Sequence, residues 1–356
     1  MHKFPYRWTL KDAIFTKDKG KVFSCFACGG GSTMGYKLAG FDVIGCNEID
    51  PKMMAAYVAN HAPKYSFLEP IQTFKLRDDL PDELFDLDIL DGSPPCSSFS
   101  MAGNREKDWG KEKKFREGQA EQVLDTLFFD FIDLAKRLQP KVVIAENVKG
   151  LLLGDAQKYV TDILIAFNDA GYYVGYKLLD ASKMGVPQRR ERVFFYAIRK
   201  DSYKGEFVDL FQSEPKLDLD FNEKAITYGE IFHEVGRRQT ELYYERWKNR
   251  TDSDDCFGQI LERTHGKGSC FSDVFAKKDK IMPTITSGGG ITDFDTGHFI
   301  SDDTFKKSGT YPLDYDFQKN KVAYMIGMSV PPVMTAQIAT RIYDQWLSVI
   351  TPQIDT

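Results

Sequence analysis

A cysteine in a rigid turn is the residue best suited to chemistry in this sequence. Ser93-Pro94-Pro95-Cys96 directly follows the apolar segment 85–90, which is typical of a buried strand. The two prolines restrict the backbone and present one thiol at the carboxyl end of that strand, where doubly wound folds bind ligands. A thiolate is a strong nucleophile, so Cys96 is a candidate for covalent catalysis. An isolated cysteine is more often a small core residue than a nucleophile. The residues expected beside Cys96 therefore determine which interpretation is favoured.

A carboxylate and several guanidinium groups are expected beside this thiol. Glu146 in Glu146-Asn147-Val148 follows the apolar segment 141–145, so it should project from the same sheet edge as Cys96. The segment Gln188-Arg189-Arg190-Glu191-Arg192 leads into the apolar strand 193–198 and supplies fixed donors, among them Arg190 and Arg192. A buried Arg–Glu pair that only stabilises the fold is the alternative interpretation.

A glycine turn near the N-terminus predicts a nucleoside site. The apolar run 21–27 leads into Gly29-Gly30-Gly31, and Glu48 follows 19 residues after Gly29. Such a turn lets the backbone approach a ligand, and a carboxylate at this spacing can accept both ribose hydroxyls. The GxGxxG pattern of pyrophosphate binding is missing, so S-adenosylmethionine fits better than a dinucleotide. The alternative is a structural turn followed by an ordinary surface glutamate.

The elements that position these groups alternate between strand and helix. Apolar periodicity predicts helices at 52–60, 119–138, 159–168 and 333–349 between the strands 21–27, 42–47, 85–90, 141–145, 172–179 and 193–198. This order predicts an α/β fold with a doubly wound, Rossmann-like sheet. The periodicity is lost after about residue 200. We therefore expect residues 1–200 and 318–356 to form a catalytic domain, with a smaller, mostly β or irregular domain at 201–317.

Composition limits the possible partners and compartments. The 356-residue chain carries a net charge of −5, so a nucleic-acid surface must come from local basic clusters, and 105–116 and 237–267 are candidates. Six irregularly spaced cysteines without a secretory signal predict reduced thiols in a cytoplasmic protein rather than a disulfide framework. Apolar runs are short, which predicts a soluble monomer without a membrane segment. The CxxC of Cys25 and Cys28 lacks a second ligand pair, so no metal site is expected.

In chain order, these segments resemble the DNA cytosine-5 methyltransferase family over nearly the whole sequence. Phe26 with Gly30-Gly31 and Gly35 is similar to the first cofactor motif, and Asn47-Glu48-Ile49-Asp50 to the second. The segment 92–100 resembles the nucleophile motif, Glu146-Asn147-Val148 the glutamate motif, and 188–192 the arginine motif. One such match is weak, whereas five in order are strong.

The resemblance implies a mechanism and a set of site residues. Cys96 would add to carbon 6 of a cytosine flipped out of double-stranded DNA, Glu146 would hydrogen-bond ring nitrogen 3 and the exocyclic amine, and Arg192 would contact the carbonyl. Carbon 5 would then accept a methyl group from S-adenosylmethionine. The implied cofactor residues are Phe26, Cys28, Gly30, Gly31, Glu48, Ile49, Pro70, Ile71, Ser93, Pro95, Leu127, Met328, Ser329 and Val330.

DNA contacts are expected in two places. The polar segment 97–118 resembles the closing loop of the family, and its candidate phosphate contacts are Ser98, Arg105, Lys113 and Lys114. The region 201–317 corresponds in position and size to the target-recognition region, where Arg263 or Lys267 would read guanine. A protein with one such region and no appended domain is expected in a bacterium or phage, protecting DNA against a nuclease.

The sequence departs from the family pattern around the cofactor. Ser24 replaces the expected strand-one acid, Cys28 the first glycine and Pro70 an aspartate, and Met328 stands where an asparagine is expected. Two alternatives follow: a modified sulfonium donor, such as one that transfers a carboxymethyl group, and a catalytically silent DNA-binding relative. A Rossmann-type oxidoreductase is a third, and the absent GxGxxG argues against it.

Overall fold

A seven-stranded sheet forms the core of the larger part of the chain. The computed structural model describes residues 2–95, 126–154, 156–209, 214–270 and 273–350, and the backbone of two short strands at 112–113 and 122–123. The strand order is β3-β2-β1-β4-β7-β9-β8, with every pair from β3 to β7 parallel and β7–β9 antiparallel. The expected doubly wound α/β fold is therefore confirmed. The direction of winding reverses between β1 and β4, and ligands of such sheets bind at this point.

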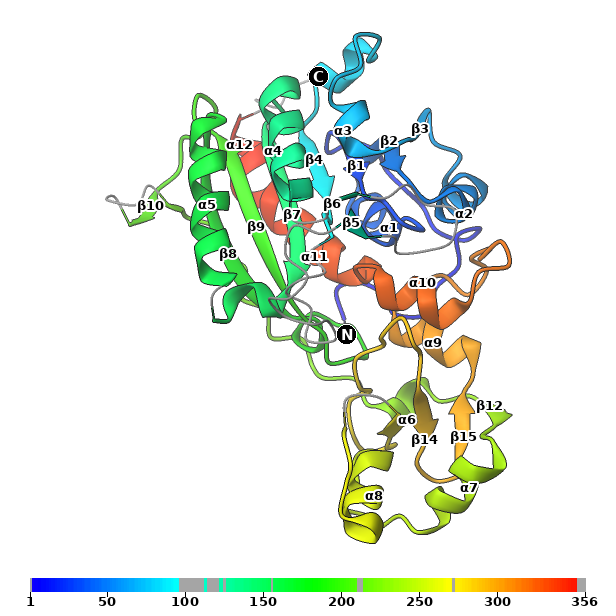
Figure 1. Ribbon diagram of the computed structural model, residues 1–356. Helices are drawn as coiled ribbons and strands as arrows, with labels where there is room; N and C mark the ends of the chain where they lie inside the picture. The colour runs from blue at the N-terminus through cyan, green and yellow to red at the C-terminus, as the bar shows by residue number, and fades with distance from the viewer. Residues whose placement is uncertain are drawn as a thin grey trace. The chain divides into compact units, whose positions relative to one another are not determined.

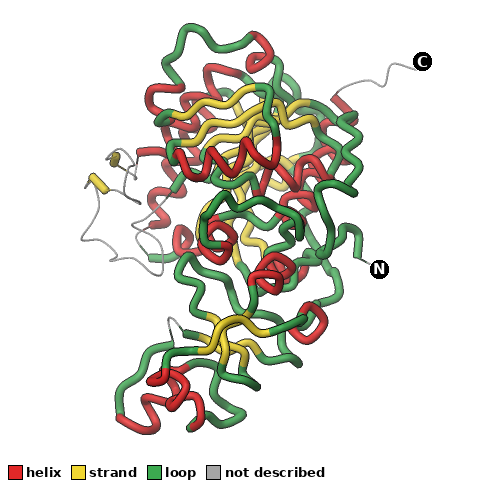
Figure 2. Tube along the Cα trace, turned by 90° about the vertical axis from the view of Figure 1, so that its right-hand side faces the viewer, coloured by secondary structure: helices red, strands yellow, loops and turns green. Residues whose placement is uncertain are grey.

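The strands of the main sheet run side by side in Figure 2 and are labelled in Figure 1. They are β1 (Lys21–Cys25), β2 (Asp42–Glu48), β3 (Tyr65–Leu68), β4 (Ile89–Gly92), β7 (Val142–Val148), β8 (Tyr172–Asp180) and β9 (Glu191–Arg199), with short ribbons β5 (Glu112–Lys113) and β6 (Gln122–Val123), and β10 (Phe207–Asp209) and β11 (Glu214–Pro215). The helices are α1 (Gly31–Leu38), α2 (Pro51–His61), α3 (Ile71–Phe74), α4 (Leu127–Leu138), α5 (Ala156–Asp169), α11 (Pro332–Ile342) and α12 (Ser348–Ile350).

Both faces of the sheet are covered. Phe195 of β9 packs into the main apolar cluster with Phe128 and Phe131 of α4, and α5 lies beside α4 in Figure 1. The next residue, Tyr196, points to the opposite face, because side chains alternate along a strand. Its ring lies 6.1 Å from that of Trp346 in the C-terminal segment. A sheet buried on both faces explains the continuous apolar strands in the sequence.

Several elements differ from the sequence prediction. Strand β4 begins at Ile89 rather than at residue 85, because a short 3₁₀ helix occupies Asp82–Phe85. The helix expected from residue 119 begins at Leu127, because Gln122–Val123 pairs with Glu112–Lys113 in an antiparallel ribbon. Strand β3 was not predicted, since its four residues are half-exposed and carry no clear apolar pattern. Its register places Phe67 opposite Asn47 of β2.

The smaller unit comprises residues 1–13, 180–190 and 221–334. Its four-stranded sheet has the order β12-β15-β14-β13, and its elements are α6 (Tyr228–Ile231), β12 (Val235–Arg238), α7 (Glu241–Lys248), α8 (Phe257–His265), β13 (Val274–Ala276), β14 (Ile291–Asp293), β15 (His298–Ile300), α9 (Asp302–Ser308) and α10 (Val322–Met328). These boundaries are not those of the proposed domains, because 180–190 and 318–334 pack with this unit and 201–220 with the larger one. The functional division at 200 and 318 stays a prediction.

One helical stretch in the described part of the chain has the length and apolar composition of a membrane span. It runs through Val322–Ile350, and 78% of its most apolar window is buried inside the protein. The same composition is found in the core helices of soluble proteins, and this stretch was not evident from the short apolar runs in the sequence.

Candidate functional site

The turn between β1 and α1 is built from unusual backbone conformations. Phe26 and Cys28 have φ angles of 52° and 49°, and Gly30 follows at 82°. The left-handed region disfavours side chains such as Phe and Cys, so the surrounding contacts must hold this turn in place. Glu48 supplies one such contact, because its carboxylate accepts a hydrogen bond from the Cys28 backbone N–H at 2.7 Å. Burial raises the pKa of Glu48, which lies almost entirely inside the protein.

Gly30 is required at its position for two reasons. Its φ of 82° suits glycine, and a Cβ there would collide with the imidazole of His61 at the end of α2. His61 is buried, and this burial lowers its pKa to about 3, so the ring is neutral at physiological pH. The glycine turn predicted from the sequence therefore packs against the neutral imidazole of His61. No sequence motif had pointed to this histidine.

Asp91 is a buried carboxylate at the carboxyl end of β4. Its Oδ2 accepts hydrogen bonds from the hydroxyls of Ser24 (2.8 Å) and Ser32 (2.7 Å), and Oδ1 accepts one from Tyr36 (3.1 Å). Burial raises the pKa of Asp91 to about 6, against the lowering effect of these donors. An acid at the end of an apolar strand, with Ser24 in place of an acid on the neighbouring strand, is the signal in the sequence that points to Asp91.

Glu146 and Arg192 meet at the same end of the sheet. The Arg192 Nε lies 2.8 Å from Glu146 Oε1, and both side chains are more than four-fifths buried. The antiparallel register of β7 and β9 places Arg192 opposite Val148, two residues beyond Glu146. A carboxylate and a guanidinium held in this way can bind complementary edges of a polar heterocycle.

The turn that leads to the predicted nucleophile is tied to the glutamate segment. The side-chain amide of Asn147 donates to the carbonyl oxygen of Pro94 at 3.1 Å, and Asn147 is buried. The parallel register of β4 and β7 pairs Gly92 with Ala145. Ser93 and Pro95 are half-buried beside these strand ends, whereas Cys96 lies outside the residues that the structure describes. The described chain thus brings the residue before Cys96 to the sheet edge that holds Glu146.

The sequence matches the C-5 cytosine-specific DNA methylase family over residues 20–344. The chain belongs to this family. It is therefore a DNA cytosine methyltransferase, and the resemblance inferred from the motifs is confirmed.

Related proteins agree with this assignment. The chain is 31% identical over 261 residues to the Type II methyltransferase M.FnuDI of Fusobacterium nucleatum, covering 73% of this chain and 67% of that protein. It is 36% identical over 262 residues to M.NgoPII of Neisseria gonorrhoeae, covering 73% and 68%. The S. pombe Dnmt2 methyltransferase has a similar fold, with a TM-score of 0.57 at 16% identity over 91% of this chain and 98% of that one.

Arg190 has a different environment from Arg192. Its side chain is 2% exposed and donates to the carbonyls of Ile285 (3.1 Å), Gly327 (2.9 Å) and Ser329 (2.8 Å), all within the smaller unit. Gln188 is similarly buried and bonds both the N–H of Ile285 and the carbonyl of Ser308. In this member of the family the first half of the arginine motif organises backbone segments of the smaller unit, and Arg192 alone pairs with Glu146.

The remaining cofactor candidates fall into three environments. Ile71 and Leu127 are buried within the main apolar cluster, and Phe26 packs against it from a partly exposed position. Gly31 begins α1, while Ile49 and Pro70 are half-buried at the ends of β2 and β3. Met328, Ser329 and Val330 belong to the smaller unit, where Met328 is 42% exposed, Val330 is buried and Ser329 accepts a hydrogen bond from the Tyr311 hydroxyl at 2.7 Å.

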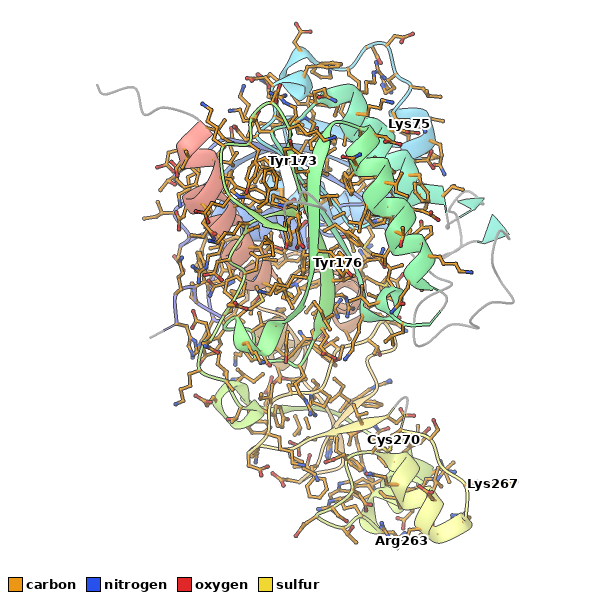
Figure 3. The ribbon with its side chains drawn as sticks, turned by 90° about the vertical axis from the view of Figure 1, so that its left-hand side faces the viewer. Lys75, Tyr173, Tyr176, Arg263, Lys267 and Cys270 are labelled. Atoms are coloured by element: carbon orange, nitrogen blue, oxygen red, sulfur yellow. A yellow bond between two sulfur atoms is a disulfide. The ribbon has the colours of Figure 1, made fainter. Side chains whose placement is uncertain are left out.

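The expected DNA contacts are only partly described. Ser98, Arg105 and Lys114 lie outside the described residues, and of Lys113 only the backbone is placed, in β5. Arg263 forms a bidentate ion pair with the buried Asp254 at 2.7 and 2.9 Å. Lys267 is exposed in the glycine loop after α8 (Figure 3). Arg263 thus stabilises its own unit, while Lys267 remains accessible.

A disulfide joins Cys256, at the start of α8, to Cys270 in the loop after this helix, and their Cα atoms lie 5.5 Å apart. The expectation of reduced cysteines is wrong for this pair, because the chain folds back over α8 so closely that Gly258 and Gly268 meet backbone to backbone. Sequence spacing alone gave no sign of this approach. Cys25, Cys28 and Cys46 are not in disulfides within the described ranges, and there no cluster of three His, Cys, Asp or Glu side chains has the arrangement of a metal site.

A basic and aromatic surface surrounds α7. The sequence analysis predicted only a cluster of basic residues in this region, at 237–267. Arg238 stacks on Tyr244, 3.9 Å from the ring centroid, and Arg250 on Trp247 at 3.8 Å. No residue of α7 is buried. Stacked guanidinium groups retain donors that can contact phosphates or bases, so this α7 surface is a better candidate for a DNA contact than Arg263.

Proposed function

We propose that this methyltransferase uses Cys96 to add to carbon 6 of a flipped-out cytosine and transfers the methyl group of S-adenosylmethionine to carbon 5. The Glu146–Arg192 pair carries the proposal, because it lies at the sheet edge to which Asn147 ties the turn before Cys96. Such a pair can hold the polar edge of one base in a fixed orientation.

The protein groups have complementary tasks in this reaction. The Cys96 thiolate forms a bond to carbon 6, while Glu146 hydrogen-bonds nitrogen 3 and the exocyclic amine, so that the charge that develops on the ring is neutralised. Arg192 contacts the base carbonyl and keeps Glu146 in place. S-adenosylmethionine would supply the methyl group that bonds to the enamine carbon 5, and its sulfur would leave as the thioether of S-adenosylhomocysteine. A base then removes the carbon 5 proton, the double bond re-forms, and the thiolate leaves.

The residues at the end of β1 and β2 fit a nucleoside donor. Glu48 is held by the backbone N–H groups of Cys28, Ile49 and Asp50 at 2.7 to 2.9 Å, so its carboxylate has one orientation. The turn at Gly30 lies at the point where the sheet reverses its winding, and Phe26 and Cys28 in it are half-buried. S-adenosylmethionine supplies an electrophilic methyl group there, and the role of this turn and of Glu48 is to orient it.

Double-stranded DNA is the proposed substrate, and extruding the target cytosine costs a few kcal/mol. We assign target recognition to residues 201–317 and loop closure to 97–118. Lys267 and the α7 surface supply cationic groups in the described part of the recognition region. Because the relatives are Type II methyltransferases, we infer a role in protecting bacterial or phage DNA from a restriction nuclease, in the cytoplasm.

Nucleoside analysis tests the proposal. The purified protein would be incubated with unmodified genomic DNA and S-adenosylmethionine, and the digested DNA would be analysed by mass spectrometry. The expected product is 5-methyl-2′-deoxycytidine with wild type and none with Cys96→Ala; Cys46→Ala, at a free thiol of β2, is the matched control. Product from Cys96→Ala would refute the nucleophile. DNA binding by wild type without any product would favour a modified donor or a silent relative.

A further inference from the structure

The hydrogen bonds of Asp91 join the two sides of the turn that precedes α1. Ser24 is the last residue but one of β1, whereas Ser32 and Tyr36 lie in the first two turns of α1. All three hydroxyls donate to the Asp91 carboxylate. A single group on β4 therefore fixes where the strand ends and where the helix begins, and so fixes the shape of residues 26–31 between them.

We propose that Asp91 is the positioning residue of the donor site, and that it takes over on β4 the acidic function that would otherwise be expected at Ser24 on β1. The two residues are register partners in the parallel β1–β4 pair. Their side chains therefore project from the same face at the same level of the sheet. A carboxylate at either position can reach the same helix start. The inference rests on the proposed donor-binding function of this turn.

The turn needs this support because its conformation is strained. Phe26 and Cys28 adopt positive φ angles, and such angles persist in non-glycine residues only when surrounding contacts determine them. Glu48 holds the Cys28 N–H from β2, and Asp91 holds Ser32 from β4. Two carboxylates on strands either side of β1 thus fix the turn from both directions.

Burial argues against an incidental role for Asp91. Ser24 and Tyr36 are fully inaccessible and Asp91 is 5% exposed, so the carboxylate has lost nearly all its hydration. Burial is the largest influence on its pKa and raises it, and Glu146 on β7 adds to this effect. Among the residues that the structure describes, the other titratable groups that face it are Tyr36, Tyr57 and Cys25, and none of these is a cation. A charge held in a core without a cation is unfavourable, which is typical of a residue retained for function.

Binding of S-adenosylhomocysteine, measured by calorimetry, tests this role. Asp91→Ser removes the acceptor, and we expect the dissociation constant to rise at least about tenfold, as for the loss of hydrogen bonds to a charged group. The double variant Ser24→Asp/Asp91→Ser returns a carboxylate to the register partner and should recover most of the affinity. At saturating donor, kcat of both variants should stay within about threefold of wild type, because the carboxylate does not touch the reacting atoms.

Asp88→Ser is the matched control. The Asp88 carboxylate also bridges β1 and its neighbour, accepting from the Lys21 N–H at 2.7 Å, but at the opposite end of the strand from the turn. The Asp88→Ser variant should lower the free energy of unfolding and leave the affinity for S-adenosylhomocysteine unchanged. Equal weakening by Asp88→Ser, wild-type affinity of Asp91→Ser, or no recovery in the double variant would each overturn the proposal. If wild type fails both to bind the probe and to methylate DNA, the donor assignment itself is wrong and the inference falls with it.

Discussion

Replacing Asp91 by asparagine should make the protein more stable at neutral pH. Burial raises the pKa of Asp91 from 3.8 to about 6, so the folded chain binds this proton more tightly than the unfolded chain. The stability that the protonated carboxyl provides is therefore present below about pH 4 and is lost as the pH rises to about 6. The shift of about two units corresponds to about 3 kcal/mol at pH 7, from 1.36 kcal/mol per unit.

Asparagine has the size of the protonated acid and cannot ionise, so the variant should not show this loss. Urea unfolding, followed by tryptophan fluorescence between pH 4.5 and 7.5, measures the effect. The free energy of unfolding of Asp91→Asn minus that of wild type should grow by about 2 kcal/mol across this range, because about 1 kcal/mol of the total effect already develops below pH 4.5. Asp78→Asn at an exposed position controls for the loss of one carboxylate. A pH-independent difference, or one that shrinks with rising pH, would refute the reasoning.

Three further predictions concern other parts of the molecule. Glu146→Gln should lower the single-turnover methylation rate about 10²- to 10³-fold with DNA affinity retained, whereas Glu191→Gln, at an exposed carboxylate paired with Lys149, should remain near wild type. Reducing the Cys256–Cys270 disulfide, which closes 14 residues, should lower the stability of the smaller unit by about 3 kcal/mol, and Cys256→Ser/Cys270→Ser should abolish the effect of dithiothreitol on the melting temperature. Arg238→Ala should weaken DNA binding in anisotropy titrations and reduce the slope of log affinity against log salt concentration. Arg263→Ala should leave this slope unchanged. It should lower the melting temperature, because it leaves Asp254 without its ion-pair partner.

Regular apolar patterns made much of the larger unit predictable. Strands β1, β2, β7 and β9 lie where the sequence placed them within a few residues, because each is an apolar run that ends at a polar or glycine-rich segment. The parallel order of β2, β1, β4 and β7 also implied that the glycine turn, Glu48 and Glu146 share one sheet edge. Glu146 and Arg192 meet there, although their ion pair depends on an antiparallel register that no local pattern specifies.

Contacts between distant segments were not predictable in the same way. Asp91 draws its three donors from β1 and α1, and Arg190 donates to carbonyls 95 to 139 residues away. The disulfide depends on the close approach of Gly258 and Gly268. Single residues acquire these roles only after the chain has folded, since hydrogen bonds between remote segments leave no periodic trace in the sequence.

Trapping the covalent intermediate would test the central claim most directly. DNA copied with 5-fluorodeoxycytidine triphosphate has no proton at carbon 5 to remove, so an enzyme that adds Cys96 to carbon 6 and methylates carbon 5 cannot release its substrate. Mass spectrometry of the digested complex with S-adenosylmethionine should identify a peptide containing Cys96 joined to a methylated fluorocytosine. Methylation of ordinary DNA by wild type without such an adduct, or an adduct on another cysteine, would contradict the proposed mechanism.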